Sequence, residues 1–109
     1  MDLTKQYNLR KLAIKKGFNL VPSLEFKNVS DYDYYIWMCK LQKWLRDTHN
    51  LHIELSVDIF DNLETMCFRG FHIIQMNDYK DLFNTNEVFK TYEEVLERGL
   101  FEALKLINK

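Results

Sequence analysis

The sequence predicts an α+β domain of two layers, in which helices cover one face of a small antiparallel sheet. The expected elements are helices at 31–49 and 91–107, strands at 51–60 and 66–76, and a candidate third strand at 87–90. An extra helix is expected at the N-terminus, over 3–16. An antiparallel sheet with one apolar face needs cover, and the apolar stripes of the two main helices have the width to supply it.

The stretch 91–107 has the clearest helical pattern. Thr91 and Glu94 fit a capping box, in which a hydroxyl and a carboxylate each accept a free backbone N–H at the helix start. Apolar or small residues recur at helical spacing, namely Tyr92, Val95, Leu96, Gly99, Leu100, Ala103, Leu104 and Ile107. Because Gly99 lies on this stripe, although glycine costs about 1 kcal/mol relative to alanine in a helix, we expect a close approach to another element there.

The helix at 31–49 has signals at both ends. Ser30 and Asp33 resemble a second capping box. Asn50 suits the left-handed residue that often follows a helix. Its apolar residues, which include both tryptophans, share one face.

The N-terminal segment 3–16 is expected to be a shorter helix that ends at Gly17, where glycine accepts a left-handed conformation. Phe18 would fold back onto its last turns. The connection at 18–30 contains Pro22, which disfavours a helix, and an extended segment or a short strand are both open for it.

Residues 51–60 alternate between apolar and polar side chains, which is typical of a strand buried on one face only. Residues 66–76 are the expected partner strand. Their alternation slips around Gly70, which indicates a β-bulge. Residues 77–87 are polar and predict a loop before the candidate third strand.

The composition predicts a single domain over residues 1–109, because 47% hydrophobic residues suit a packed core and argue against disorder. No apolar run approaches the roughly 20 residues that cross a bilayer, so no membrane association is expected. Two cysteines on different elements argue against a disulfide framework. The N-terminus lacks the apolar core of a signal peptide, so we expect a cytoplasmic location.

Two stretches carry a resemblance to known sequences. KWLRDTHNLHIEL (43–55) and VFKTYEEVLERGLFEALKLI (88–107) resemble a group of small uncharacterised proteins of gut Bacteroidales and their phages, and LAIKKGF (12–18) is similar to the same group. The resemblance covers about half of the chain. It implies an origin in phage or mobile elements and the same order of helices and strands, and it implies no activity.

No motif indicates catalysis, a cofactor or a metal. P-loop, dinucleotide-binding and nucleophile-elbow sequences are absent. His49 and His52 straddle a helix end and a strand start, without the paired short spacings of a zinc site. Cys39 and Cys67 fall within a helix and a strand, where cysteine usually behaves as a small hydrophobe. We therefore expect a protein that is not an enzyme and that holds no cofactor.

Charge is distributed unevenly. Residues 1–20 carry five basic residues and one acidic residue, which gives +4, while the remaining residues give −5. The candidate basic contacts for nucleic acid are Arg10, Lys11, Lys15 and Lys16. The alternative is a basic helix that docks near an acidic body. The element order over 31–107 is that of a double-stranded RNA-binding domain, but Glu93 and Glu94 at the start of the last helix would repel phosphate.

Contact with another protein, or self-association, is the function that these exclusions leave. Candidate residues for an interaction surface are Tyr35, Phe60 and Phe101, because exposed aromatic residues suit interface cores. The polar face of 51–60 has no evident cover. We expect a small accessory protein of a phage or mobile element that acts by protein–protein interaction, with nucleic-acid binding by the N-terminal helix as the alternative.

Overall fold

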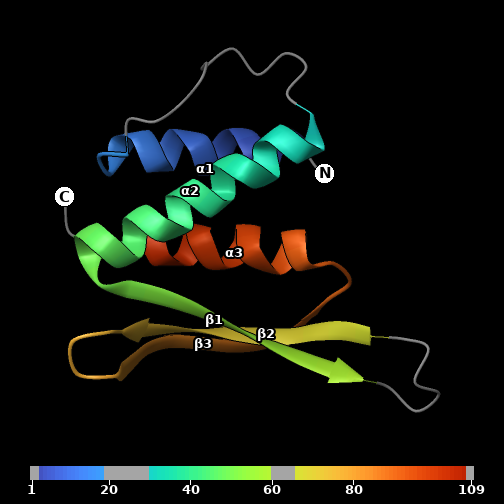
Figure 1. The fold of residues 1–109 in the computed structure, drawn as a ribbon. Coiled ribbons are helices and arrows are strands. Elements are labelled where there is room, and N and C mark those ends of the chain that lie inside the picture. The colour runs from blue at the N-terminus through green and yellow to red at the C-terminus, as the bar shows by residue number, and fades with distance from the viewer. Residues whose placement is uncertain (1–2, 19–29, 60–65, 108–109) are drawn as a thin grey trace.

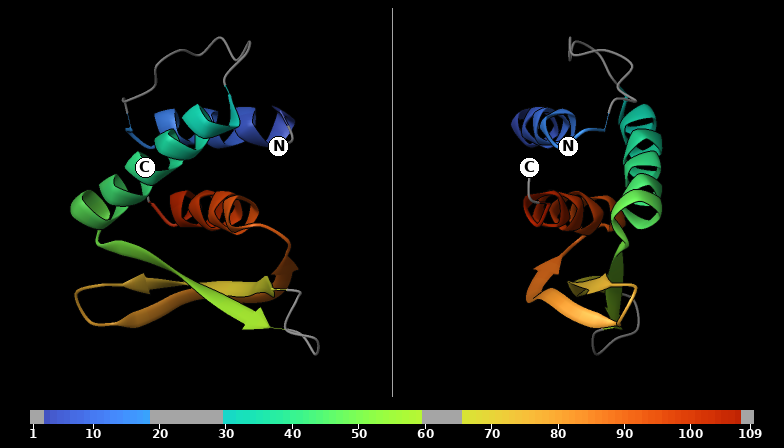
Figure 2. Two further views of the ribbon diagram at one scale, coloured as in Figure 1. Left: turned by 45° about the vertical axis from the view of Figure 1, so that its right-hand side comes forward. Right: turned by 90° about the vertical axis from the view of Figure 1, so that its left-hand side faces the viewer.

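A computed structural model describes residues 3–18, 30–59 and 66–107 of the chain. The elements in order are α1 (Leu3–Lys15), α2 (Asp31–His49), β1 (Leu51–Ile59), β2 (Met66–Gln75), β3 (Lys80–Phe89) and α3 (Tyr92–Lys105). The three helices lie on the same side of an open antiparallel sheet (Figure 1), which confirms the predicted α+β class. The helix α1 lies outside α3, farther from the sheet, and α2 runs beside both (Figure 2).

Both predicted N-caps are present. The Ser30 hydroxyl accepts the backbone N–H of Asp33, and the Thr91 hydroxyl accepts that of Glu94, each at 3.1 Å. Asn50 ends α2 in the left-handed conformation, with φ of 56°. Each contact satisfies a backbone group that a helix end would otherwise leave without a partner, so short polar sequences determine these boundaries.

The end of α1 is a glycine cap of the predicted kind. Gly17 has φ of 107°, and its N–H donates to the carbonyl of Ile14 at 3.0 Å. The N–H of Phe18 donates back to the carbonyl of Ala13, also at 3.0 Å, which completes a Schellman motif. The Phe18 ring is buried against Trp37 and Trp44, with ring centroids 5.9 and 5.3 Å away. The cap therefore also fastens the end of α1 to α2.

The sheet has the strand order β1–β2–β3, and both pairs are antiparallel. Between the pairs Leu55–Phe71 and Val57–Phe68, β2 advances by three residues and β1 by two. This extra residue is the bulge predicted at Gly70, which has φ of 78°. A Cβ atom there would overlap the backbone of Thr85 on β3, so the position requires glycine.

The strand β3 corrects the prediction of a loop over 77–87. The turn occupies 76–79, and the strand begins at Lys80 rather than at 87. Its side chains alternate poorly because its pairing with β2 shifts register twice and because most of them are exposed. The rings of Phe83 and Phe89 lie 5.6 and 6.4 Å from that of Phe71. A polar edge strand of this kind depends on backbone pairing and a few anchors, and it leaves a weak sequence pattern.

The main core lies between α3 and the sheet, with α2 along its side. Its fully buried members on α3 are Val95, Leu96, Leu100, Ala103 and Leu104. Gly99 is the close-approach point that the sequence predicts. A Cβ atom on Gly99 would lie 2.9 Å from Cγ2 of Ile53 and 3.6 Å from Cδ2 of Phe71. Because Gly99 has no side chain, α3 packs directly onto β1 and β2 at this point.

A buried polar cluster joins the three helices. The Tyr34 hydroxyl donates to Oε2 of Glu97 at 2.6 Å. The guanidinium of Arg10 lies over the rings of Tyr34 and Trp37, at 5.6 and 5.9 Å from their centroids. Arg10 and Gln6 are only 1% and 2% exposed. The helix α1 therefore packs through polar and cation–π contacts as well as through Leu9 and Ala13.

Burial affects the ionisation of this cluster. Burial raises the pKa of Tyr34, and its hydrogen bond to Glu97 raises that pKa further. Burial also lowers the pKa of the Arg10 guanidinium, while the neighbouring Tyr34 acts in the opposite direction. A phenol that stays protonated can continue to donate to a carboxylate, so the bond persists in alkaline solution while the protein is folded.

We expect Gly99→Leu to destabilise the protein by about 3 kcal/mol, the upper part of the usual range for overpacking, because its side chain would push α3 away from Ile53 and Phe71. Chemical denaturation followed by tryptophan fluorescence measures this change. Lys40→Leu, at an exposed position of α2, is the matched control and should be nearly neutral. A Gly99→Leu variant as stable as the wild type would contradict this docking of α3.

We expect Tyr34→Phe to destabilise by about 1–3 kcal/mol, because Glu97 loses a buried donor. Since the pKa of Tyr34 is raised above 10.0 in the folded protein, its contribution is complete below pH 10 and declines as the pH rises above that value. Above pH 10 the stability of the wild type should therefore fall more steeply than that of Tyr34→Phe, by up to about 1.4 kcal/mol per pH unit.

Urea denaturation between pH 8 and 11 tests this difference. Tyr32→Phe is the control, because Tyr32 lies on the same helix with 72% of its surface exposed. Identical pH profiles for Tyr34→Phe and the wild type would contradict the assignment of the buried bond.

Candidate interaction site

The structure does not unite the aromatic residues that the sequence indicates as an interaction surface. Phe60 lies outside the described residues. Tyr35 is half-buried on α2, with its ring 6.0 Å from that of Tyr92. A hydrogen bond with Cys39 and, after it, burial raise the pKa of Tyr35 to about 12. Phe101 follows Tyr92 by two and a half helical turns, so it lies on the other side of α3. Tyr35 and Phe101 therefore belong to different surfaces.

Phe101 borders a groove between α1, β3 and α3, which has a volume of about 490 Å³. The residues that line it are Lys5, Asn8 and Leu9 from α1, Glu87, Val88 and Phe89 from β3, and Glu94, Glu97, Arg98, Phe101 and Glu102 from α3. We call this feature the α1–α3 groove. Leu9 and Phe89 are buried and form its base, whereas Val88 is 52% exposed at its rim.

The charges of the α1–α3 groove are predominantly negative. Four glutamates line it, against Lys5 and Arg98, which leaves a formal charge of −2. Glu97 is the deepest of these glutamates, because it is 8% exposed and accepts the Tyr34 hydroxyl. The wall of the groove is thus continuous with the buried polar cluster that joins the helices.

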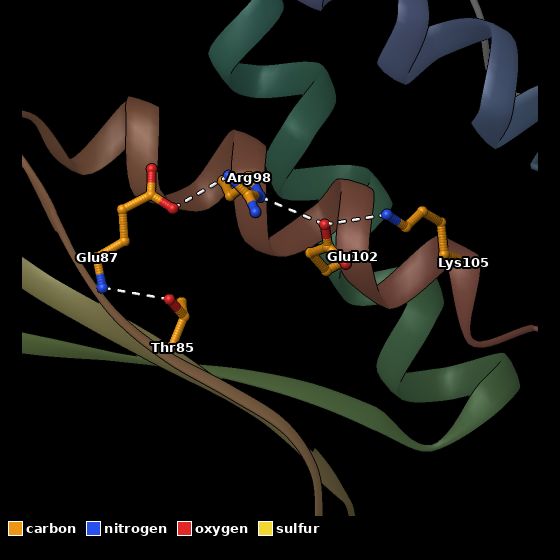
Figure 3. A network of polar contacts seen from close by, with 5 residues as sticks. All are labelled: Thr85, Glu87, Arg98, Glu102 and Lys105. Atoms are coloured by element: carbon orange, nitrogen blue, oxygen red, sulfur yellow. Dashed lines mark hydrogen bonds and ion pairs between the residues drawn. The ribbon is translucent and has the colours of Figure 1, made fainter.

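Arg98 connects two walls of the groove, as Figure 3 shows. Its Nη1 lies 3.1 Å from Oε1 of Glu87 on β3, and its Nε lies 3.3 Å from Oε1 of Glu102 on α3. Lys105 donates to the same Glu102 oxygen at 3.2 Å. The Arg98 and Glu87 side chains are 42% and 48% exposed, and exposed ion pairs contribute at most about 1 kcal/mol. This bridge at the mouth of the groove is therefore easily exchanged for another charged partner.

The four basic residues predicted on the N-terminal helix do not form one surface. Arg10 is buried, so the prediction that it contacts nucleic acid is wrong for this residue. Lys16 donates to the carbonyl of Ile107 at 2.6 Å, which joins the ends of α1 and α3. Lys11 and Lys15 are exposed. The net charge of a segment does not distinguish an exposed cation from one that stacks on aromatic rings in the interior.

Along β1, His52 and Glu54 alternate with the buried Leu51 and Ile53, and Ile53 faces α3, so His52 and Glu54 lie on the face of the sheet away from the helices. His52 pairs with Ile74 and Glu54 with His72 across this face. His72 Nδ1 lies 3.0 Å from Oδ2 of Asp81, and this contact lowers the pKa of Asp81. Glu54 is exposed on this face, whereas His52 is half-buried.

Other kinds of site find little support. Over the described ranges, no group of three or more histidines, cysteines, aspartates or glutamates could hold a metal ion. None of the described helices combines the length and apolar character that crossing a bilayer requires. Comparison with protein-family models, with curated proteins and with solved structures finds no significant match to this chain.

Sequence reasoning identifies Phe101 but not the rest of the α1–α3 groove. Lys5 on α1 is far in the chain from Glu87 on β3 and Arg98 on α3, and only folding brings α1 beside these two elements. The available signal was the density of glutamate from Glu87 to Glu102. That density resembles the ordinary solvated face of a helix, so it could not indicate a groove.

Proposed function

We propose that this protein acts by binding another protein, without a catalytic step, through the α1–α3 groove. The observation that carries the proposal is a groove with an apolar base and a charged rim, formed on one side by the half-buried Phe101. An apolar centre with a polar rim is the usual composition of an interface. The sequence resemblance supports an accessory protein of a phage or mobile element, and the N-terminal sequence and the two separate cysteines favour a cytoplasmic location.

The dimensions of the groove suit a short segment of a partner. Its volume of about 490 Å³ lies within the range of roughly 300–1,000 Å³ that is typical of pockets for small ligands. Such a groove takes a few side chains and not a folded surface. The partner is a second protein or a second copy of this chain that presents those side chains.

Nucleic-acid binding through α1 is the alternative, and less supports it. Of the four basic residues considered, Lys11 and Lys15 are exposed, Arg10 is buried, and Lys16 is half-buried with its ammonium on the Ile107 carbonyl. Two exposed lysines provide few phosphate contacts, and affinity for nucleic acid depends mainly on their number. The glutamates of the adjacent groove would repel a phosphate backbone.

We expect Phe101→Ser to abolish association through the groove while the fold is retained, because the substitution removes its aromatic wall. The measurements are affinity capture from the native host and sedimentation of the purified protein, with circular dichroism to check the fold. Tyr32→Ser, at an exposed position of α2, should leave association unchanged. A wild-type protein that captures nothing and sediments strictly as a monomer would count against the proposal.

We further expect weak retention of the protein on heparin at physiological salt, and little effect of Lys11→Glu with Lys15→Glu. Both lysines are exposed, so this double variant should fold normally. Strong, salt-dependent retention that the charge reversal removes would favour nucleic-acid binding over protein interaction.

A further inference from the structure

The residues that line the α1–α3 groove include four glutamates and two cations, Lys5 and Arg98. Arg98 contacts Glu87 and Glu102, Lys105 also donates to Glu102, and Glu97 is already the acceptor of the Tyr34 hydroxyl. One guanidinium divides its two contacts between Glu87 and Glu102, so neither glutamate receives a bidentate partner from Arg98. Bidentate pairing is the stronger arrangement for a carboxylate. An additional cation at the mouth would improve the electrostatic balance.

Apolar surface adjoins these carboxylates. Phe89 and Leu9 form the base of the groove, Phe101 forms part of its wall, and Val88 is half exposed at the rim. Phe101 already accepts a cation, since the ammonium of Lys105 lies 5.1 Å from its ring centroid. A ligand for this groove therefore needs both large apolar groups and positive charge, a few bonds apart.

We infer that the α1–α3 groove binds a short peptide segment of a partner protein in which arginine or lysine alternates with large apolar side chains. The inference rests on the proposed function and names the partner's chemistry. The apolar side chains contact Phe89 and Phe101, and one cation binds Glu87 at the position that Arg98 now occupies. Arg98 is then a competitor that the segment displaces.

The exposure of the Arg98 bridge supports this exchange. The bridge is largely in water, so its replacement by a second guanidinium costs little electrostatic free energy, while the apolar contacts add to binding. An acidic segment or a phosphate group would meet the same glutamates as like charges. The charge of the groove thus discriminates between ligands by repulsion as well as by attraction.

The test uses the intact protein and three capped pentapeptides with leucine and phenylalanine at alternate positions. The intervening residues are arginine in the first peptide, glutamine in the second and glutamate in the third. Titration is followed by ¹H–¹⁵N NMR, which reports whether the amides of β3 and α3 around Glu87 and Phe101 shift. We expect the arginine peptide to shift these amides and to bind at least about tenfold more tightly than the glutamate peptide.

Charge variants test which side chains of the groove bind the peptide. Glu87→Gln and Glu94→Gln should each weaken binding of the arginine peptide by about two- to fivefold, the effect of one exposed charge pair. Arg98→Gln should strengthen it by a similar factor, because it removes the competitor. Glu54→Gln, on the opposite face of the sheet, is the matched control and should have no effect.

The outcomes separate this inference from the proposed function. If the glutamine or glutamate peptide shifts the groove amides as strongly as the arginine peptide, the inferred chemistry is wrong and the groove remains an interaction site. Unchanged affinity in Arg98→Gln and Glu87→Gln would also overturn the inferred exchange at Glu87. If no peptide shifts these amides at millimolar concentration, both the inference and the groove as a docking site are refuted.

Discussion

The contact of Gly99 with Ile53 and Phe71 determines how closely α3 lies to the sheet. Among the described elements, α3 is the one that contacts all the others, since it packs on the three strands and on both remaining helices. The positions of α1 and α2 therefore depend on this single close approach. The groove depends on it too, because its walls are α3 and the two elements that flank α3, α1 and β3. A side chain at position 99 would thus affect the site as well as the core.

The buried cluster around Arg10 explains why a weakly amphipathic helix holds one position. A buried ion or dipole adds little net stability relative to an apolar side chain of the same size, because desolvation offsets the attraction. The buried guanidinium does disfavour other positions of α1, because any shift of this helix would remove Arg10 from the rings of Tyr34 and Trp37. This specificity places Lys5 and Leu9 in the lining of the groove. Core packing and the geometry of the site are therefore coupled through α1.

Local signals allowed much of this fold to be predicted. Each of these signals depends on chemistry within a few residues, and each corresponds to a feature of the structure. They are the capping sequences at Ser30 and Thr91, the alternation of 51–60, and the glycines at 70 and 99. The sequence indicated only the end of β3, at 87–90, and the part from Lys80 onward was missed because pairing with β2, and not its own pattern, makes it a strand.

The groove and the buried Arg10 were missed for a different reason. Both arise when α1 packs on elements that are distant from it in the chain. The composition and periodicity of a sequence carry no information about such contacts. An arginine that stacks on rings contributed by another helix has the same local sequence as one that points into solvent. Likewise, the glutamates of β3 and α3 line one groove only when the chain brings the two elements together.

The two register shifts of β3 have a consequence for how this protein can associate. An edge strand normally offers a row of free backbone donors and acceptors, on which another chain can add a strand. Here the shifts near Leu82 and between Thr85 and Val88 interrupt that row, and the exposed charges of Lys80 and Asp81 lie at its start. The edge is therefore a poor template for amyloid-like growth. On this side of the molecule, a partner is therefore recognised through side chains and not through backbone pairing with β3.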